Sequence, residues 1–174
     1  MTTRYIFKKA KKISHQFSRD DRAVVKALCC KIKTAQGELL QAAEKNMLKC
    51  IQICKGMCCK NLDIDSIFSQ WDFIFILSLL PHLQDDMEKR LESHLFLFYA
   101  DCPFLKDKDG PCMFPSGVKA QICIITFCGD DKFLKKSIKK VNYLFFKLSL
   151  LVFFLRMKSI LDNLFSIFIQ KQCK

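Results

Sequence analysis

Residues 81–99 read PHLQDDMEKRLESHLFLFY, and this stretch decides the fold class. Its large apolar residues recur every three or four positions, at Leu83, Met87, Leu91, Leu95 and Phe98. That spacing places them on one face of an α-helix. Pro81 suits the first helical turn, where its missing N–H has no intrahelical partner. Acidic residues follow at 85, 86 and 88, near the positive end of the helix dipole. The stretch therefore predicts a buried amphipathic helix over 82–99.

The same periodicity extends to both sides of this segment. Apolar spacing and helix-start residues predict further helices over 4–17, 22–33, 38–59, 65–80, 117–128 and from 131 onward. Gly37 is expected to separate the second from the third. Such lengths, joined by short turns, are typical of antiparallel helix pairs. We therefore predict an all-α fold of antiparallel helix pairs, with HEAT- or armadillo-like stacking of successive pairs.

The predicted starts of two of these helices rest on N-cap residues. Asp65 and Ser66 are predicted to cap the helix over 65–80, and Ser116 the helix over 117–128. The run FIFIL at 73–77 is also compatible with a buried strand. The apolar stretch continues through Leu80, which favours a helix.

The composition changes between Lys140 and Val141. Residues 141–174 (VNYLFFKLSLLVFFLRMKSILDNLFSIFIQKQCK) contain no Ala, Gly or Pro and are rich in residue types with AT-rich codons. We predict a helical body over 1–140, able to fold alone, and a hydrophobic helical tail over 141–174. The tail is interpreted as read-through of an AT-rich intron, which would make the chain a splice variant or fragment of a larger protein, or as a membrane-seeking segment. Charges within it favour an interfacial helix over a spanning one.

Charge is distributed unevenly along the chain, whose formal net charge is +12. Residues 1–60 hold 14 Lys or Arg against 4 Asp or Glu, a net +10. Residues 61–105 hold 2 against 8, a net −6. The two regions either neutralise one another within the fold or leave a basic half that faces an acidic partner.

The segment 4–17 (RYIFKKAKKISHQF) is basic and contains no acidic residue. Its apolar residues at 6, 10, 13 and 17 have helical spacing, which favours the first helix of the fold. A nuclear localisation signal at 8–12 and a mitochondrial presequence are the alternatives. The cations expected to contact phosphate or an acidic partner are Lys8, Lys9, Lys11, Lys12, Arg19 and Arg22.

Eleven cysteines and no secretory signal predict reduced thiols in the cytoplasm or nucleus. Cys50, Cys54 and Cys58 share one predicted helix face, and no C-x-x-C pair is present, so core packing is favoured over metal binding. A second conceivable zinc set has irregular spacing: Cys102, Cys112, Cys123 and Cys128 with His94. No catalytic, cofactor or metal site is predicted.

These patterns together predict a non-enzymatic intracellular scaffold that binds other proteins through its helical surfaces. One alternative is a membrane-associated protein held by residues 141–174. Another is a nucleic-acid-associated protein that uses the basic segment 4–33, although no recognised readout module is present.

Overall fold

The structure, a computed structural model, describes residues 2–44, 57–60, 62–93, 101–106, 111–126 and 132–172, without the side chains of 57, 58 and 162–172. Within these ranges the fold is all-α, as predicted, with isolated bridges and no strands, and one of these bridges joins Leu105 to Cys112. The helices, in chain order, are α1 (Thr3–Gln16), α2 (Arg19–Ala42), α4 (Met57–Lys60), α5 (Ile64–Ile67), α6 (Gln70–Leu79), the 3-10 turn η2 (Pro81–Leu83), α7 (Gln84–Ser93), α8 (Gln121–Ile125), the 3-10 turn η3 (Lys132–Leu134) and α9 (Lys135–Gln172).

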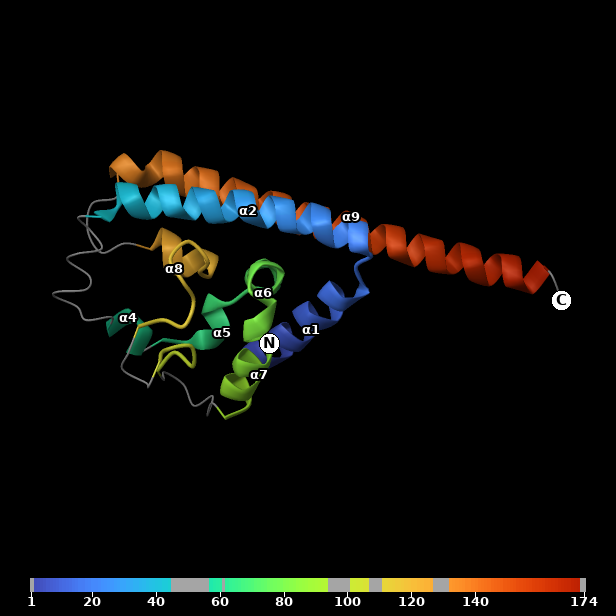
Figure 1. Cartoon of the computed structure of the whole chain (residues 1–174), viewed down its shortest axis with the longest axis horizontal. Coiled ribbons are helices and arrows are strands. Elements are labelled where there is room, and N and C mark those ends of the chain that lie inside the picture. Colours follow the sequence, from blue (N-terminus) through green and yellow to red (C-terminus); the bar gives the residue numbers. More distant parts are fainter. Residues whose placement is uncertain are drawn as a thin grey trace.

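The two longest helices, α2 and α9, lie side by side and antiparallel along one edge of the molecule (Figure 1). Helices α1, α6 and α7 lie together on one side of this pair. The most extensive contacts join α2 to α9 and α1 to α6, which are distant in the sequence. In a HEAT or armadillo array each unit packs mainly on its sequence neighbours. The observed pairing therefore differs from the stacking of successive pairs that the sequence suggested.

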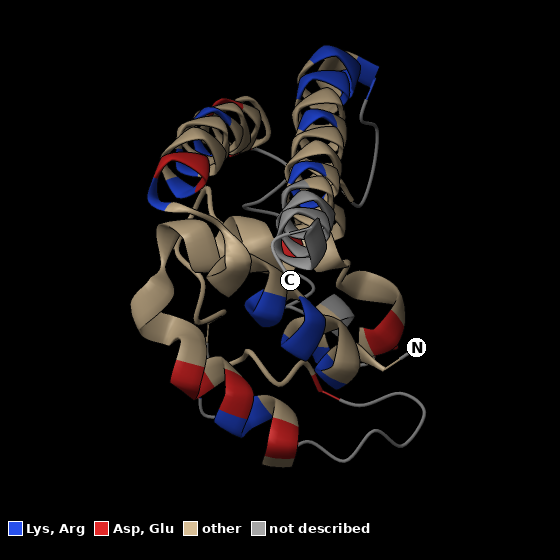
Figure 2. Ribbon diagram, turned by 90° about the vertical axis from the view of Figure 1, so that its right-hand side faces the viewer, with Lys and Arg blue, Asp and Glu red and all other residues tan. Residues whose placement is uncertain are grey.

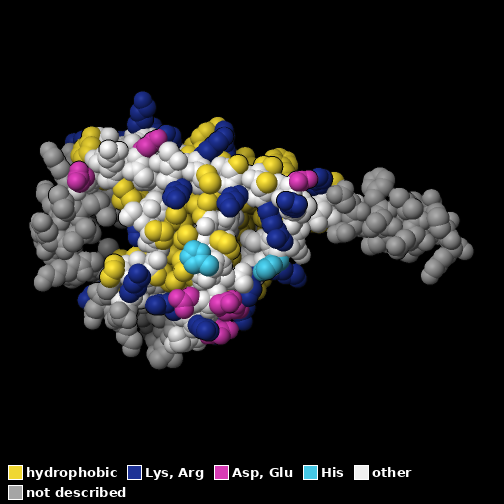
Figure 3. All heavy atoms as spheres, viewed as in Figure 1, with side chains coloured by type: hydrophobic (Ala, Val, Ile, Leu, Met, Phe, Trp, Pro, Cys, Tyr) yellow, Lys and Arg dark blue, Asp and Glu magenta, His cyan; other side chains and the backbone are white. Residues whose placement is uncertain are grey.

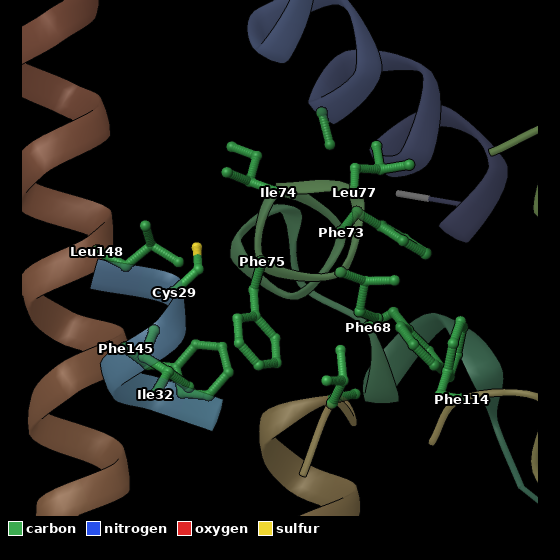
Figure 4. Packing of buried hydrophobic residues seen from close by; sticks show 14 of the residues in the cluster. Cys29, Ile32, Phe68, Phe73, Ile74, Phe75, Leu77, Phe114, Phe145 and Leu148 are labelled. Atoms are coloured by element: carbon green, nitrogen blue, oxygen red, sulfur yellow. The ribbon is translucent and has the colours of Figure 1, made fainter. Parts of the chain in front are cut away.

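Helix α6 lies at the centre of the core and is apolar on all sides over residues 73–77, which are all buried. Phe75 points toward α2 and α9, whereas Phe73 lies on the side of Phe68 (Figure 4). The Phe75 ring meets the Phe145 ring edge to face at 5.3 Å, and Phe73 stacks on Phe68 at 5.1 Å. A helix enclosed by other helices has no polar face, so its sequence lacks helical periodicity. This explains why 73–77 also resembles a buried strand.

The start of α6 differs from the prediction. Ser69 and Asp72 form a reciprocal capping box there, instead of caps at Asp65 and Ser66. The buried Asp72 carboxylate also accepts the Gln121 N–H at 2.6 Å. One carboxylate therefore holds the beginnings of both α6 and α8.

Helix α2 continues through Gly37, where a break was predicted. A glycine within a helix costs about 1 kcal/mol relative to alanine, and the buried residues on both sides, among them Ile32 and Leu39, outweigh this cost. The separate helix predicted from 38 is therefore wrong at its start, because α2 is one helix of 24 residues. Residues 45–56 lie outside the described part of the chain.

The helix predicted over 117–128 is present only as α8, Gln121–Ile125. Gly117 has φ of 80°, a left-handed conformation that does not begin a helix. A Cβ at this position would lie 3.3 Å from the Lys33 carbonyl oxygen of α2. Glycine therefore permits both the turn and the close approach to α2.

The helix predicted over 82–99 is present as η2 followed by α7. Met87 and Leu91 are fully buried and Leu83 is half-buried, whereas Leu95 and Phe98 lie outside the described residues. Lys11 of α1 pairs with Glu88 of α7 at 2.6 Å. Asp and Glu gather on α7, next to the basic α1 (Figure 2). Part of the predicted charge asymmetry is thus neutralised within the fold.

Helix α9 crosses the domain boundary predicted between Lys140 and Val141. Four residues of the predicted tail belong to the core and are at most 2% exposed: Val141, Phe145, Leu148 and Val152. The division into 1–140 and 141–174 therefore does not follow a boundary in the structure, and residues 1–140 alone would lack these side chains. The far end of α9 extends beyond the other helices (Figure 1).

Candidate binding groove between α1 and α9

Helix α1 holds three of the predicted contact residues, Lys8, Lys9 and Lys12, close together on its outer side. The helix begins where the Thr2 hydroxyl accepts the Tyr5 N–H. Its opposite side is buried against the core through Ile6, Phe7, Ala10 and Ile13. Since these apolar residues recur every three or four positions, the lysines between them face outward.

Two adjoining hollows of about 460 and 190 Å³ lie between α1 and α9. The larger is lined by Tyr5, Lys8, Lys9, Lys12, Ile13, Gln16 and Arg156. The smaller shares Gln16 and Arg156 and is otherwise lined by Phe17, Asp21, Leu155, Ser159 and Ile160. Together they form one groove, named the α1–α9 groove below, in which four cations surround several apolar side chains.

The α1–α9 groove carries a positive charge. Its one acidic lining residue, Asp21, accepts hydrogen bonds from the Ser18 hydroxyl and N–H at 2.7 and 3.3 Å. Among the described residues, no carboxylate forms an ion pair with Lys8, Lys9 or Lys12. Cations gathered around a concave surface focus the potential and attract anionic groups. On the face of the molecule seen in Figure 3, Lys and Arg side chains are widely spread and several acidic side chains gather toward the lower part.

The other three predicted contact residues do not line the groove. Lys11 pairs with Glu88. Arg22 donates to the Phe17 and His15 carbonyl oxygens, both at 3.0 Å, and closes the corner between α1 and α2. Arg19 is exposed at the start of α2.

Arg156 is a lining residue that the sequence reasoning missed. It is the only Arg in the predicted tail, and nothing in its local sequence indicates a site. Its place opposite α1 depends on the antiparallel return of α9 along α2.

Burial raises the pKa of three described thiols, those of Cys29, Cys102 and Cys123. Burial raises the pKa of Cys29 to about 12, although a hydrogen bond with Ser78 acts in the opposite direction. Burial also raises the pKa of Cys102 to about 12, and the neighbouring thiols of Cys112 and Cys59 add to this shift. A thiol with such a pKa is almost entirely protonated at neutral pH, so Cys29 and Cys102 are weak nucleophiles.

The cysteine sets considered for metal binding are only partly described. Cys50, Cys54, His94 and Cys128 lie outside the described residues. In the ranges that the structure covers, no three His, Cys, Asp or Glu residues are grouped so that they could hold a metal ion. The Cys102 N–H donates to the Cys59 carbonyl oxygen at 2.7 Å, so this thiol pair is brought together by main-chain pairing.

Comparison with models of protein families, with curated proteins and with solved structures found no match to this chain.

Proposed function

We propose that this protein is a non-enzymatic helical scaffold that binds an acidic segment of a partner protein in the α1–α9 groove. The observation that carries the proposal is the convergence of four cations around apolar side chains. Lys8, Lys9 and Lys12 come from α1, and Arg156 comes from near the middle of α9.

The chemistry of the groove favours a peptide that is both acidic and apolar. Glu or Asp carboxylates would form charge-assisted hydrogen bonds with the lysines and Arg156. Apolar side chains of the same peptide would cover Leu155, which is partly exposed, and Ile160, which is exposed. From Tyr5 to Gln16 the lining of α1 is about 16 Å long at 1.5 Å per residue. That length accommodates about three turns of a helix or about five residues of extended chain.

Nucleic acid is the competing ligand for the same cations. A phosphate backbone would contact Lys8, Lys9, Lys12 and Arg156, and its affinity would fall steeply with salt. It would leave the apolar lining of the smaller hollow without a partner. The mixed lining therefore favours a protein segment, and a nucleic-acid probe belongs in the same experiment.

Fluorescence anisotropy with a labelled amphipathic peptide of Glu and Leu would test the proposal. The informative variant is Lys8→Glu with Lys12→Glu, because both side chains are exposed and line the groove. Its matched control is Lys26→Glu with Lys31→Glu, which makes the same charge change on exposed residues of α2 outside the groove lining.

We expect the groove variant to weaken peptide binding about tenfold or more, which corresponds to about 1.4 kcal/mol, and the control to change it less than about twofold. Equal weakening by both variants would show non-specific attraction to a basic protein and would contradict the proposal. Tighter binding of a single-stranded oligonucleotide, lost in the groove variant, would identify nucleic acid as the ligand instead.

A further inference from the structure

The outer side of α9 carries a row of exposed large apolar residues, which we name the α9 stripe. They are between 39% and 63% exposed: Tyr143, Phe146, Leu150, Phe153, Phe154, Met157, Ile160 and Leu161. At 100° per residue they cover about a third of the helix circumference and run for about 27 Å. The core residues of the same helix, Val141 to Val152, lie on the opposite side. Helix α9 is therefore apolar on two faces, of which α2 and the core cover one.

Cations accompany the stripe and acids are absent from it. From Lys135 to Leu161 the sequence contains seven Lys or Arg and no Asp or Glu. Lys147 and Lys158 are exposed and, by helical position, lie along one edge of the stripe. The Lys147 ammonium lies 4.6 Å from the centre of the Tyr143 ring. Exposed lysines also precede the stripe at 136 and 139.

We infer that the α9 stripe lies on the surface of an anionic lipid bilayer. A helix with an apolar face flanked by Lys and Arg binds in the plane of the interface by burying apolar area, while its cations attract anionic headgroups. Phe and Leu are typical of the apolar face of such a helix and Tyr of the headgroup level, and the stripe contains three Phe, two Leu and one Tyr. The part of α9 that extends past the other helices leaves room for a flat surface to approach (Figure 1).

Two alternatives, dimerisation through the stripe and insertion of α9 across a bilayer, are disfavoured. A second copy of this chain would bring together two proteins that each have a net charge of +12, which repel one another. Insertion across a bilayer is also disfavoured, because no helix among the described residues is long and apolar enough to span one. The stripe lies on the outer side of α9 and shares one residue, Ile160, with the α1–α9 groove.

Vesicle sedimentation with the full-length chain would test the inference. The probes are vesicles of phosphatidylcholine alone and vesicles in which about a third of the lipid is phosphatidylserine. The stripe variant combines Phe146→Gln, Leu150→Gln and Phe153→Gln, all at exposed positions. The control combines Val24→Gln and Phe133→Gln, which are also exposed apolar residues but lie outside the stripe. Circular dichroism would establish that both variants remain helical.

We expect the unmodified chain to bind the anionic vesicles and to bind them more weakly at about 0.5 M salt. The stripe variant should lose about tenfold or more in affinity, and the control should bind like the unmodified chain. In a second measurement, Phe153→Trp should add emission that shifts to shorter wavelength when anionic vesicles are added.

Three outcomes would overturn the inference. One is equal binding by the stripe variant and the unmodified chain, and another is the absence of binding together with no shift for Phe153→Trp. The third is a dimer of the unmodified chain in sedimentation velocity that the stripe variant dissociates, without vesicle binding, because the occupant would then be a second copy.

Discussion

Gln36 and Lys119 are joined by two hydrogen bonds between a side-chain amide and a main-chain peptide. The Gln36 Nε2 donates to the Lys119 carbonyl oxygen at 2.9 Å, and the Lys119 N–H donates to the Gln36 Oε1 at 3.0 Å. Gln36 is fully buried. Its amide thus pairs with the main chain as a neighbouring strand would, and it fixes the segment before α8 on α2.

Replacing Gln36 with Leu should lower the free energy of unfolding by about 1–3 kcal/mol. The reason is that the partly buried Lys119 N–H and carbonyl oxygen would lose these partners. Urea denaturation would measure the change, and Gln41→Leu, at an exposed position of the same helix, is the control. Similar stabilities for the two variants would contradict this role of Gln36.

Phe145 and Phe146 are adjacent in α9 but have opposite environments, with exposed fractions of 2% and 58%. Phe145→Ala should destabilise the fold by about 3–5 kcal/mol, because it empties the space beside Phe75 and leaves a cavity. Phe146→Ala should change stability by less than about 0.5 kcal/mol. Thermal or urea melts of the pair would test whether this part of α9 belongs to the core, and equal, small effects would place it outside.

Leu91→Ala in α7 should destabilise the protein by about 2–5 kcal/mol, since Leu91 is fully buried. Lys89→Ala, at an exposed position on the same helix, is the matched control. Denaturant melts that place Leu91→Ala within about 0.5 kcal/mol of the unmodified chain would remove α7 from the core.

Asp72 should make stability depend on pH. Burial raises the pKa of this carboxyl group, although the hydrogen bonds from Ser69 and the Gln121 N–H act in the opposite direction. A group whose pKa is higher in the folded chain contributes stability below its unfolded pKa of about 4, and this contribution is lost as pH rises through the folded pKa.

Asp72→Asn removes this titration and also removes an acceptor. The loss of the acceptor lowers the stability of the variant by the same amount at every pH. The unmodified chain alone loses stability as Asp72 ionises, so the difference in free energy of unfolding should move in favour of the variant as pH rises from about 4 toward 7. Urea melts across this range would measure the difference, and parallel curves for the two proteins would contradict a raised pKa.

Cys29 and Cys30 should react at very different rates with iodoacetamide. Cys29 is buried and its pKa is raised to about 12, whereas the side chain of Cys30 is exposed on α2. Brief alkylation of the folded protein followed by peptide mass spectrometry should find the label on Cys30, and label on Cys29 only after denaturation. Comparable labelling of both in the folded protein would show that this face of α2 is not packed.

The apolar spacing of α1 was sufficient to predict its buried face, and with it the outward position of Lys8, Lys9 and Lys12. The same reasoning placed Met87 and Leu91 of α7 in the core, and both are fully buried. These are amphipathic helices with one side in water, so the alternation of apolar and polar residues predicts which side is buried.

Other features were decided by tertiary contacts. Residues 73–77 of α6 and the two apolar faces of α9 lack this alternation. Apolar residues on several sides of a helix remove the polar face that makes its sequence periodic. The cost of Gly37 is outweighed only once α2 packs against the core and the turn at Gly117. Arg156 meets the lysines of α1 because α9 returns antiparallel along α2, a pairing between residues too distant in the sequence for any local pattern to encode.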